Sequence, residues 1–155
     1  MTSGLYTVDQ RARRDATIWT TVQGILAPIQ LVVCLVSAVL AVRYLSSGAG
    51  YELATASILL KTALLYTIMV TGAVWEKVVF GQYLFAPAFF WEDVVSMAVI
   101  ALHTGYLLAL ALDAPAVTQM TIALVAYAVY VVNAAQFLLK LRAARRQAPA
   151  AGVPA

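Results

Sequence analysis

Three carboxylates and seven aromatic residues gather in residues 75–95, WEKVVFGQYLFAPAFFWEDVV. Glu76, Glu92 and Asp93 are three of only seven acidic residues in a 155-residue chain that is 63% hydrophobic and 11% charged. Carboxyl groups in different environments can serve as general acid and general base in one reaction. The segment therefore indicates proton-transfer chemistry beside a flat, apolar, aromatic surface.

The expected helix ends distinguish the three carboxylates electrostatically. Glu76 closes one apolar helix, where burial and the negative end of the dipole favour the neutral acid. Glu92 and Asp93 lie in the first turns of the next helix, which Pro87 can start and whose dipole favours the anion. We predict Glu76 as proton donor and Glu92 as base, with Asp93 in reserve because it points about 100° away. Pairing of Glu76 with Lys77 would let the roles swap.

His103 is the only histidine in the chain. It shares a helical face with Glu92 and lies roughly 16 Å further along the helix. An intramembrane histidine can ligate the metal of a tetrapyrrole, shuttle protons or bond a neighbouring helix. The sequence leaves these roles open.

Polar residues also lie within two other apolar segments. Asn133, Gln136 and Lys140 share part of a face on the last helix, where they either join helices or contact a ligand. Lys61 lies about 22 Å from Glu76 along the expected second helix. We expect its ammonium group to snorkel to the far membrane surface.

Four apolar segments position these residues. The charged fraction is far below the roughly 25% that is usual for soluble domains, so lipid is the expected solvent. A helix needs roughly 20 apolar residues to cross a bilayer. We therefore predict an all-α integral membrane four-helix bundle in a single domain, residues 1–145, followed by a disordered tail, 146–155. The expected spans are about 17–45, 53–79, 88–112 and 115–141, and a capping box from Thr7 to Gln10 opens a short amphipathic helix before them.

Basic residues are distributed unequally between the two sides of this bundle. Eight of the ten lie on the side that carries both termini and the connection between the second and third spans. The positive-inside rule then places both termini in the cytoplasm. Membrane topology and attraction to the lipid bilayer account for the net positive charge of the chain, so nucleic acid is not needed as a partner. The single cysteine, Cys34, excludes a disulfide within one chain.

Long runs of the chain resemble the vinyl bacteriochlorophyllide hydratase family. They are VTGAVWEKVVFGQYLFAPAFFWEDVVSMAVIALHT, NAAQFLLKLRAAR near the end and LYTVDQRARRDATIWTTVQGILAPIQ near the start. The likeness extends from about Leu5 to Arg145. It implies hydration of the ring-A vinyl group of a chlorophyllide-type tetrapyrrole to a hydroxyethyl group, in the inner (intracytoplasmic photosynthetic) membrane of a bacterium.

This chemistry agrees with the residues described above. A proton must reach the terminal vinyl carbon and water the inner one, and the conjugated macrocycle stabilises the cation between them. Acid–base groups shielded from bulk water suffice, so no cofactor or metal of the protein's own is expected. The substrate brings its own magnesium, for which His103 or a water is a plausible axial partner. Its propionate suits Lys77, Lys140 or Arg142, and further expected substrate contacts are Trp75, Tyr83, Phe89, Phe90, Trp91, Asn133 and Gln136.

Two other functions compete with the hydratase. A pigment carrier or assembly factor would use the same aromatic pocket but would tolerate loss of the three carboxylates. A proton-coupled transporter would need a continuous polar path, yet mostly Leu, Ile and Val lie between Lys61 and His103. Self-association and association with other pigment-biosynthesis enzymes are both left open.

Overall fold

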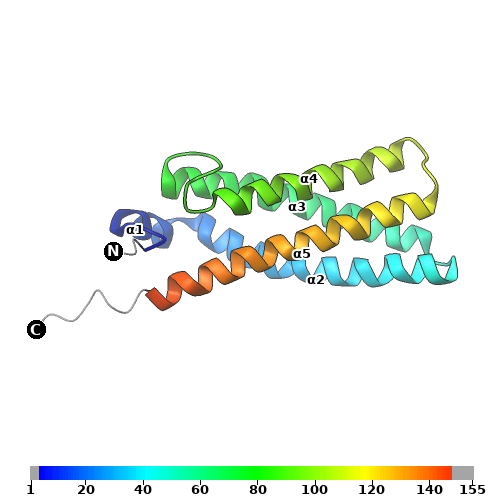
Figure 1. The fold of residues 1–155 in the computed structure, drawn as a ribbon, viewed down its shortest axis with the longest axis horizontal. Helices are drawn as coiled ribbons and strands as arrows, with labels where there is room; N and C mark the ends of the chain where they lie inside the picture. Colours follow the sequence, from blue (N-terminus) through cyan, green and yellow to red (C-terminus); the bar gives the residue numbers. More distant parts are fainter. Residues whose placement is uncertain (1–3, 148–155) are drawn as a thin grey trace, which may run out of the picture.

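The computed structural model describes residues 4–147, which form five α-helices and no strand (Figure 1). The helices are α1 (Val8–Ala16), α2 (Ile18–Ser47), α3 (Tyr51–Phe80), α4 (Phe90–Ala111) and α5 (Ala116–Gln147). The all-α class expected from the sequence is thus confirmed. Most of the expected tail, residues 148–155, lies outside the described residues.

Four of the five helices are long and apolar enough to cross a membrane. These are α2 to α5, and the shortest, α4, has 22 residues. At 1.5 Å per residue it extends about 33 Å, slightly more than the roughly 30 Å hydrocarbon core of a bilayer. The expectation of four apolar spans is confirmed.

The helix ends follow from local sequence. Thr7 and Gln10 form the expected capping box at the start of α1. Gly48 and Gly81 end α2 and α3 in the left-handed conformation, with φ of 71° and 88°, which glycine adopts without a Cβ clash. The expectation that Pro87 starts the next helix is wrong, because the chain turns through residues 86–89 and α4 begins only at Phe90.

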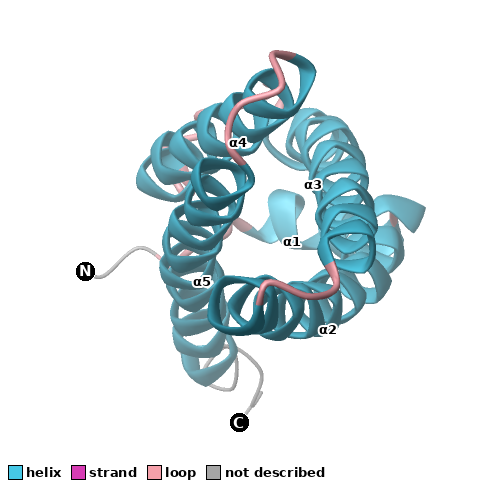
Figure 2. Cartoon of the chain, turned by 90° about the vertical axis from the view of Figure 1, so that its right-hand side faces the viewer, coloured by secondary structure: helices cyan, strands magenta, loops and turns pink. Residues whose placement is uncertain are grey.

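The helices pack as two antiparallel hairpins. Figure 2 looks along the bundle, where α2 packs on α3, α4 packs on α5, and α2 with α5 joins the two pairs. Polar contacts cross these interfaces: Gln23 donates to Thr71 (2.7 Å), and the Ser37 hydroxyl bonds that of Tyr127 (2.7 Å). Contact between α3 and α4 is sparser than in the other neighbouring pairs.

One end of the bundle carries α1, the loop 81–89 and the C-terminal part of α5 (Figure 1). We call it the basic end, because it holds Arg11, Arg13, Arg14, Lys77, Lys140, Arg142, Arg145 and Arg146. Arg13 ties α1 to the last turn of α3 by donating from Nε (3.0 Å) and Nη2 (2.8 Å) to the Val79 carbonyl. The candidate carboxylates lie at this same end, on α3 and α4.

Candidate functional site

Two buried carboxyl groups hold the loop 81–89 at the basic end. Glu76 accepts the Ala86 N–H (3.2 Å), and Asp93 accepts the Phe85 N–H (2.8 Å). Phe85 has φ of 59°, a conformation that costs free energy for a non-glycine residue, so these bonds help to fix the loop. The Glu76 and Asp93 carboxyl groups also lie close enough to interact electrostatically. The end of α3 and the start of α4 therefore bring two acids side by side.

Glu92 is engaged separately, on the side of α4 that faces α5. Its Oε2 forms an ion pair with Lys140 Nζ (2.6 Å), which also donates to the Ala88 carbonyl. Asn133 donates to the Glu92 carbonyl (2.9 Å) and accepts from Ser96 (3.0 Å). These bonds join α4 to α5, and they occupy Lys140 within the protein.

Lys77 does not pair with Glu76. Its Nζ donates to the Gly81 carbonyl (2.8 Å) and lies 5.3 Å from the centroid of the Tyr83 ring. The contact that would swap the acid and base roles is thus not formed. Gln136 approaches Asn133 at 3.5 Å, the limit of a hydrogen bond.

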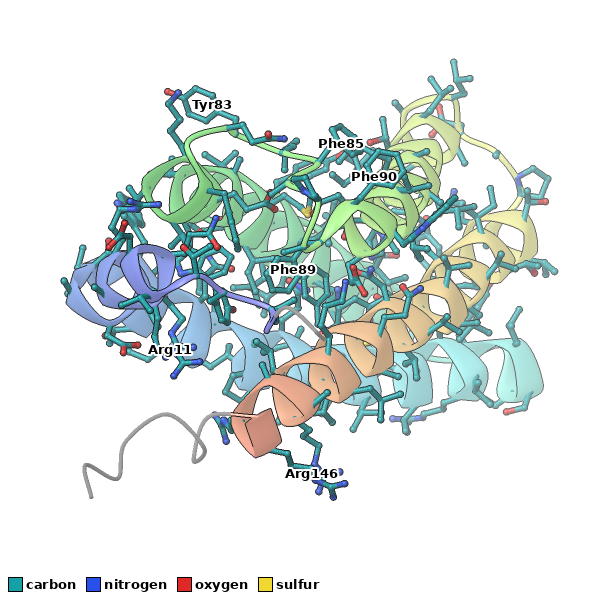
Figure 3. All side chains as sticks on the ribbon, turned by 60° about the vertical axis from the view of Figure 1, so that its left-hand side comes forward. Arg11, Tyr83, Phe85, Phe89, Phe90 and Arg146 are labelled. Carbon is teal, nitrogen blue, oxygen red and sulfur yellow. The ribbon has the colours of Figure 1, made fainter. Side chains whose placement is uncertain are left out.

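The aromatic residues of the segment divide into two groups. Phe89 is buried and packs against other rings at centroid distances of 5.7 to 6.4 Å; its ring partners are Tyr6, Trp75, Phe80 and Phe137. Tyr83 and Trp91 are instead 61% and 68% exposed, and Phe90 packs against Phe85 and Trp91. Figure 3 shows Phe89 pointing inward and Tyr83 standing on the outer side of the loop. The aromatic residues of the segment therefore form a buried group and an exposed group, and not one continuous surface.

His103 lies deep in the bundle and is 1% exposed. Its Nδ1 donates to the Val99 carbonyl of its own helix (2.8 Å), since a carbonyl can only accept. Nε2 then carries the lone pair, and it has no hydrogen-bond partner among the described residues. The ring lies 5.8 Å from that of Tyr127 on α5. The imidazole thus joins no other helix by a hydrogen bond and keeps one basic nitrogen free.

The expectation that Lys61 snorkels to the surface is wrong, because the residue is 0% exposed. It shares the core-facing side of α3 with Ile58 and Leu65, three residues before and four after it, so its side chain points into the bundle. Nζ lies 3.7 Å from the centroid of the Tyr130 ring. It has no hydrogen-bond partner in the part of the chain that the structure describes. The spacing to Ile58 and Leu65 was the sequence signal for this placement.

The 2-vinyl bacteriochlorophyllide hydratase family matches residues 6–143. The chain belongs to this family. A 2-vinyl bacteriochlorophyllide hydratase of Rhodobacter capsulatus is 70% identical over 144 residues, which are 93% of this chain and 84% of that protein. One of Cereibacter sphaeroides is 69% identical over 147 residues, 95% of this chain and 92% of the relative. No solved structure matches the chain.

Membership of the 2-vinyl bacteriochlorophyllide hydratase family makes the chain an enzyme, a hydro-lyase of bacteriochlorophyll biosynthesis. Its four apolar helices are those of a multi-pass membrane protein. The enzyme class requires a proton donor and a proton acceptor near the reacting carbons. Glu76 and Asp93 are the neighbouring buried carboxyl groups at the basic end.

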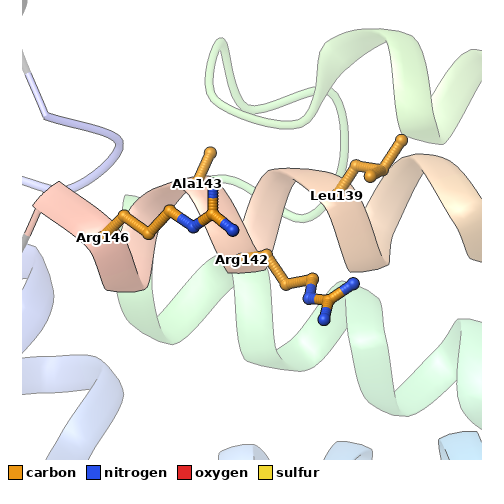
Figure 4. Close-up of a pocket in the computed structure, with 4 residues that line it drawn as sticks. All are labelled: Leu139, Arg142, Ala143 and Arg146. Atoms are coloured by element: carbon orange, nitrogen blue, oxygen red, sulfur yellow. The ribbon is translucent and has the colours of Figure 1, made fainter.

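Two surface grooves of this hydratase lie at the basic end. One, of about 430 Å³, runs beside the loop that Glu76 and Asp93 hold; it is lined by Gly4, Leu5, Gln10, Phe80, Pro87 and Ala88. The other, of about 390 Å³, is formed on α5 by Leu139, Arg142, Ala143 and Arg146 (Figure 4). Arg142, one of the expected propionate contacts, thus lies in a groove beside a second arginine. This places a positively charged rim at the same end as the carboxyl pair.

Proposed function

We propose that the chain adds water to the ring-A vinyl group of a chlorophyllide or bacteriochlorophyllide, giving a 1-hydroxyethyl group. The observation that carries this proposal is the adjoining carboxyl pair of Glu76 and Asp93, in a chain whose relatives are named hydratases over nearly its full length. Both groups are buried, so a proton held there is shielded from bulk water.

The pair supplies both proton transfers of the reaction. Two adjoining carboxylates repel each other, and one shared proton relieves the repulsion. Glu76 gives that proton to the terminal vinyl carbon, and a water oxygen then bonds to the inner carbon. The proton that this water releases returns to the carboxyl pair, so one molecule of water is added and the pair is restored. The assignment of Glu92 as base stays a prediction, and its ion pair with Lys140 favours Asp93 in that role.

The protein's own residues also account for substrate placement. Nε2 of His103 offers a lone pair to the magnesium that the substrate carries, and no cofactor of the protein's own takes part. Arg142, in its groove at the basic end, is suited to the propionate. The excess of basic residues at this end supports its placement on the cytoplasmic side of a bacterial inner membrane.

Incubation of the purified protein with vinyl chlorophyllide tests the function. We expect a product heavier by one water, and in isotopically labelled water the added oxygen should carry the label. Heat-denatured protein serves as the control. Pigment that binds but leaves unchanged in mass would contradict the hydratase proposal and support a carrier instead.

A further inference from the structure

Lys61 and His103 form a buried polar site that the carboxyl pair does not account for. Lys61 Nζ and His103 Nε2 are both fully enclosed, and neither has a hydrogen-bond partner among residues 4–147. Polar groups left unpaired in an apolar interior destabilise the folded state, especially within a membrane. Such groups are therefore expected to serve a ligand.

The two groups lie against the same part of α5. Lys61 reaches from α3 to the ring of Tyr130, and His103 reaches from α4 to the ring of Tyr127. Tyr127 and Tyr130 are three residues apart and so neighbour each other on one helix. Lys61 and His103 are also close enough to interact electrostatically. An amine from α3 and an imidazole from α4 thus contact neighbouring rings of α5.

Their chemistry specifies the ligand. A lysine amine donates hydrogen bonds in either protonation state, so Lys61 requires an oxygen acceptor. The lone pair of His103 Nε2 requires a metal ion or a donated hydrogen. A magnesium tetrapyrrole with an oxygen substituent at its edge offers both in one molecule. A single water bridging the two groups is the competing occupant, since it can accept from Lys61 and donate to His103.

The position of Lys61 selects among the oxygen substituents. Lys61 is 15 residues, or roughly 22 Å, from Glu76 along α3, toward the end of the bundle opposite the basic end. If Glu76 protonates the ring-A vinyl group, Lys61 meets the edge of the macrocycle remote from ring A. The ring ketone of a chlorophyllide lies across the macrocycle from ring A, whereas the propionate is on the ring next to ring A. The geometry thus favours the ketone for Lys61 and leaves the propionate to the basic end.

We propose that Lys61 is a substrate-binding residue that donates a hydrogen bond to the ring ketone of the tetrapyrrole while His103 faces its magnesium. This inference rests on the proposed function, because that function supplies the ligand. Contact between α3, which carries Lys61, and α4, which carries His103, is sparser than in the other neighbouring helix pairs, so the macrocycle is expected to enter on this side.

Lys61→Met tests the proposal, because methionine is similar in length and apolar but has no hydrogen to donate. The affinities of the full-length wild type and the variant are measured for three pigments: vinyl chlorophyllide, its analogue with the ring ketone reduced to a methylene, and its propionate methyl ester. We expect the wild type to prefer the ketone over the methylene analogue by about 10-fold or more. Lys61→Met should bind the two equally, with the weaker affinity. Replacing the propionate by its methyl ester should change the pigment affinity of both proteins by the same factor.

The outcomes separate the possible roles of Lys61. A ketone preference that survives in Lys61→Met overturns the proposal and leaves the bridging water as the occupant. If the methyl ester changes the affinity of the wild type but not that of Lys61→Met, the proposal is also overturned, since Lys61 would then bind the carboxylate. Arg43→Met, which removes an exposed basic residue at the opposite end from the carboxyl pair, is the matched control and should keep the wild-type preferences.

A structural role for Lys61 makes a different prediction for the pigment-free protein. Removal of an unpartnered buried amine should leave the thermal midpoint unchanged or raise it. A lower midpoint together with an unchanged ketone preference would mean that Lys61 serves only the fold. Hydration by the wild type is measured in parallel. If the wild type adds water and Lys61→Met keeps the ketone preference, only this inference is refuted. If the wild type prefers the ketone but adds no water, only the hydratase function is refuted.

Discussion

At the scale of single residues, Glu76 has two separable tasks, because one carboxyl group both adjoins Asp93 and accepts the Ala86 N–H. Glu76→Gln keeps an oxygen acceptor for that N–H but removes the transferable proton. A positioned general acid typically contributes 10²–10⁴-fold in rate, and we expect the variant to lose hydration on about that scale while it still binds pigment. Steady-state hydration and pigment titration measure the two effects. Near-normal turnover by Glu76→Gln would refute its role as proton donor.

Asp93 and Glu92 are adjacent in sequence but differ in their contacts. Asp93→Asn should lose activity nearly as strongly as Glu76→Gln, because it removes the other half of the carboxyl pair. Glu92→Gln instead leaves Lys140 without its carboxylate, so we expect it chiefly to destabilise the α4–α5 contact, by about 1–3 kcal/mol. Hydration rates and thermal midpoints of the two variants distinguish these effects. A greater loss of rate in stable Glu92→Gln than in Asp93→Asn would restore Glu92 as the base.

The sequence predicts where the acidic residues lie better than it predicts their partners. Spacing places Glu76 and Asp93 at facing helix ends, and the structure brings them together. It does not predict that Lys140 is already paired with Glu92, since the two residues lie 48 positions apart in the sequence. The prediction for Lys61 is wrong although a long side chain can often reach the membrane surface. Lys61 lies on the same side of α3 as buried residues, so its side chain points into the bundle.

At the scale of elements, α1 is joined to the membrane helices chiefly at the end of α3. Arg13 makes two bonds to the Val79 carbonyl there, and Tyr6, just before α1, packs against Phe89. We expect Arg13→Gln to weaken this attachment by about 1–2 kcal/mol and to expose α1 to added protease. Arg11→Gln removes the same charge from a side chain that makes no hydrogen bond or ion pair with residues 4–147, and it is the control. Equal protease resistance in both variants would show that α1 is held by its apolar contacts alone.

Helix positions were predictable, but the loop between α3 and α4 was not. The lengths of the apolar segments predict the four spans, and Thr7 with Gln10 marks the start of α1. The start of α4 depends instead on bonds from Glu76 and Asp93 to backbone groups of the loop, and these exist only once the two helices are adjacent. Tertiary contacts thus override the helix-starting tendency of Pro87.

At the scale of the whole molecule, the bundle has a buried carboxyl pair at one end and, near its middle, an amine and an imidazole that have no hydrogen-bond partner among the described residues. The carboxyl pair lies at the basic end with Arg142, and Lys61 with His103 lies roughly 16–22 Å further along the helices. This arrangement suits a flat ligand that lies along the bundle axis with its polar acid group at the basic end. The chemistry would then occur at the membrane surface, where water is available, while the rest of the macrocycle stays in apolar surroundings.

The excess of basic residues predicts that the basic end faces the cytoplasm, which single-cysteine labelling can test. Ser47 and Gln82 are exposed at opposite ends of the bundle, whereas the native Cys34 is buried and should stay silent. With a membrane-impermeant maleimide applied to intact cells, we expect Ser47→Cys to be labelled and Gln82→Cys to react only after lysis, because the positive-inside rule keeps the arginine-rich end inside. Cys34→Ala in both backgrounds removes any residual native signal. Labelling of Gln82→Cys in intact cells would invert the topology and place the carboxyl pair on the outer side.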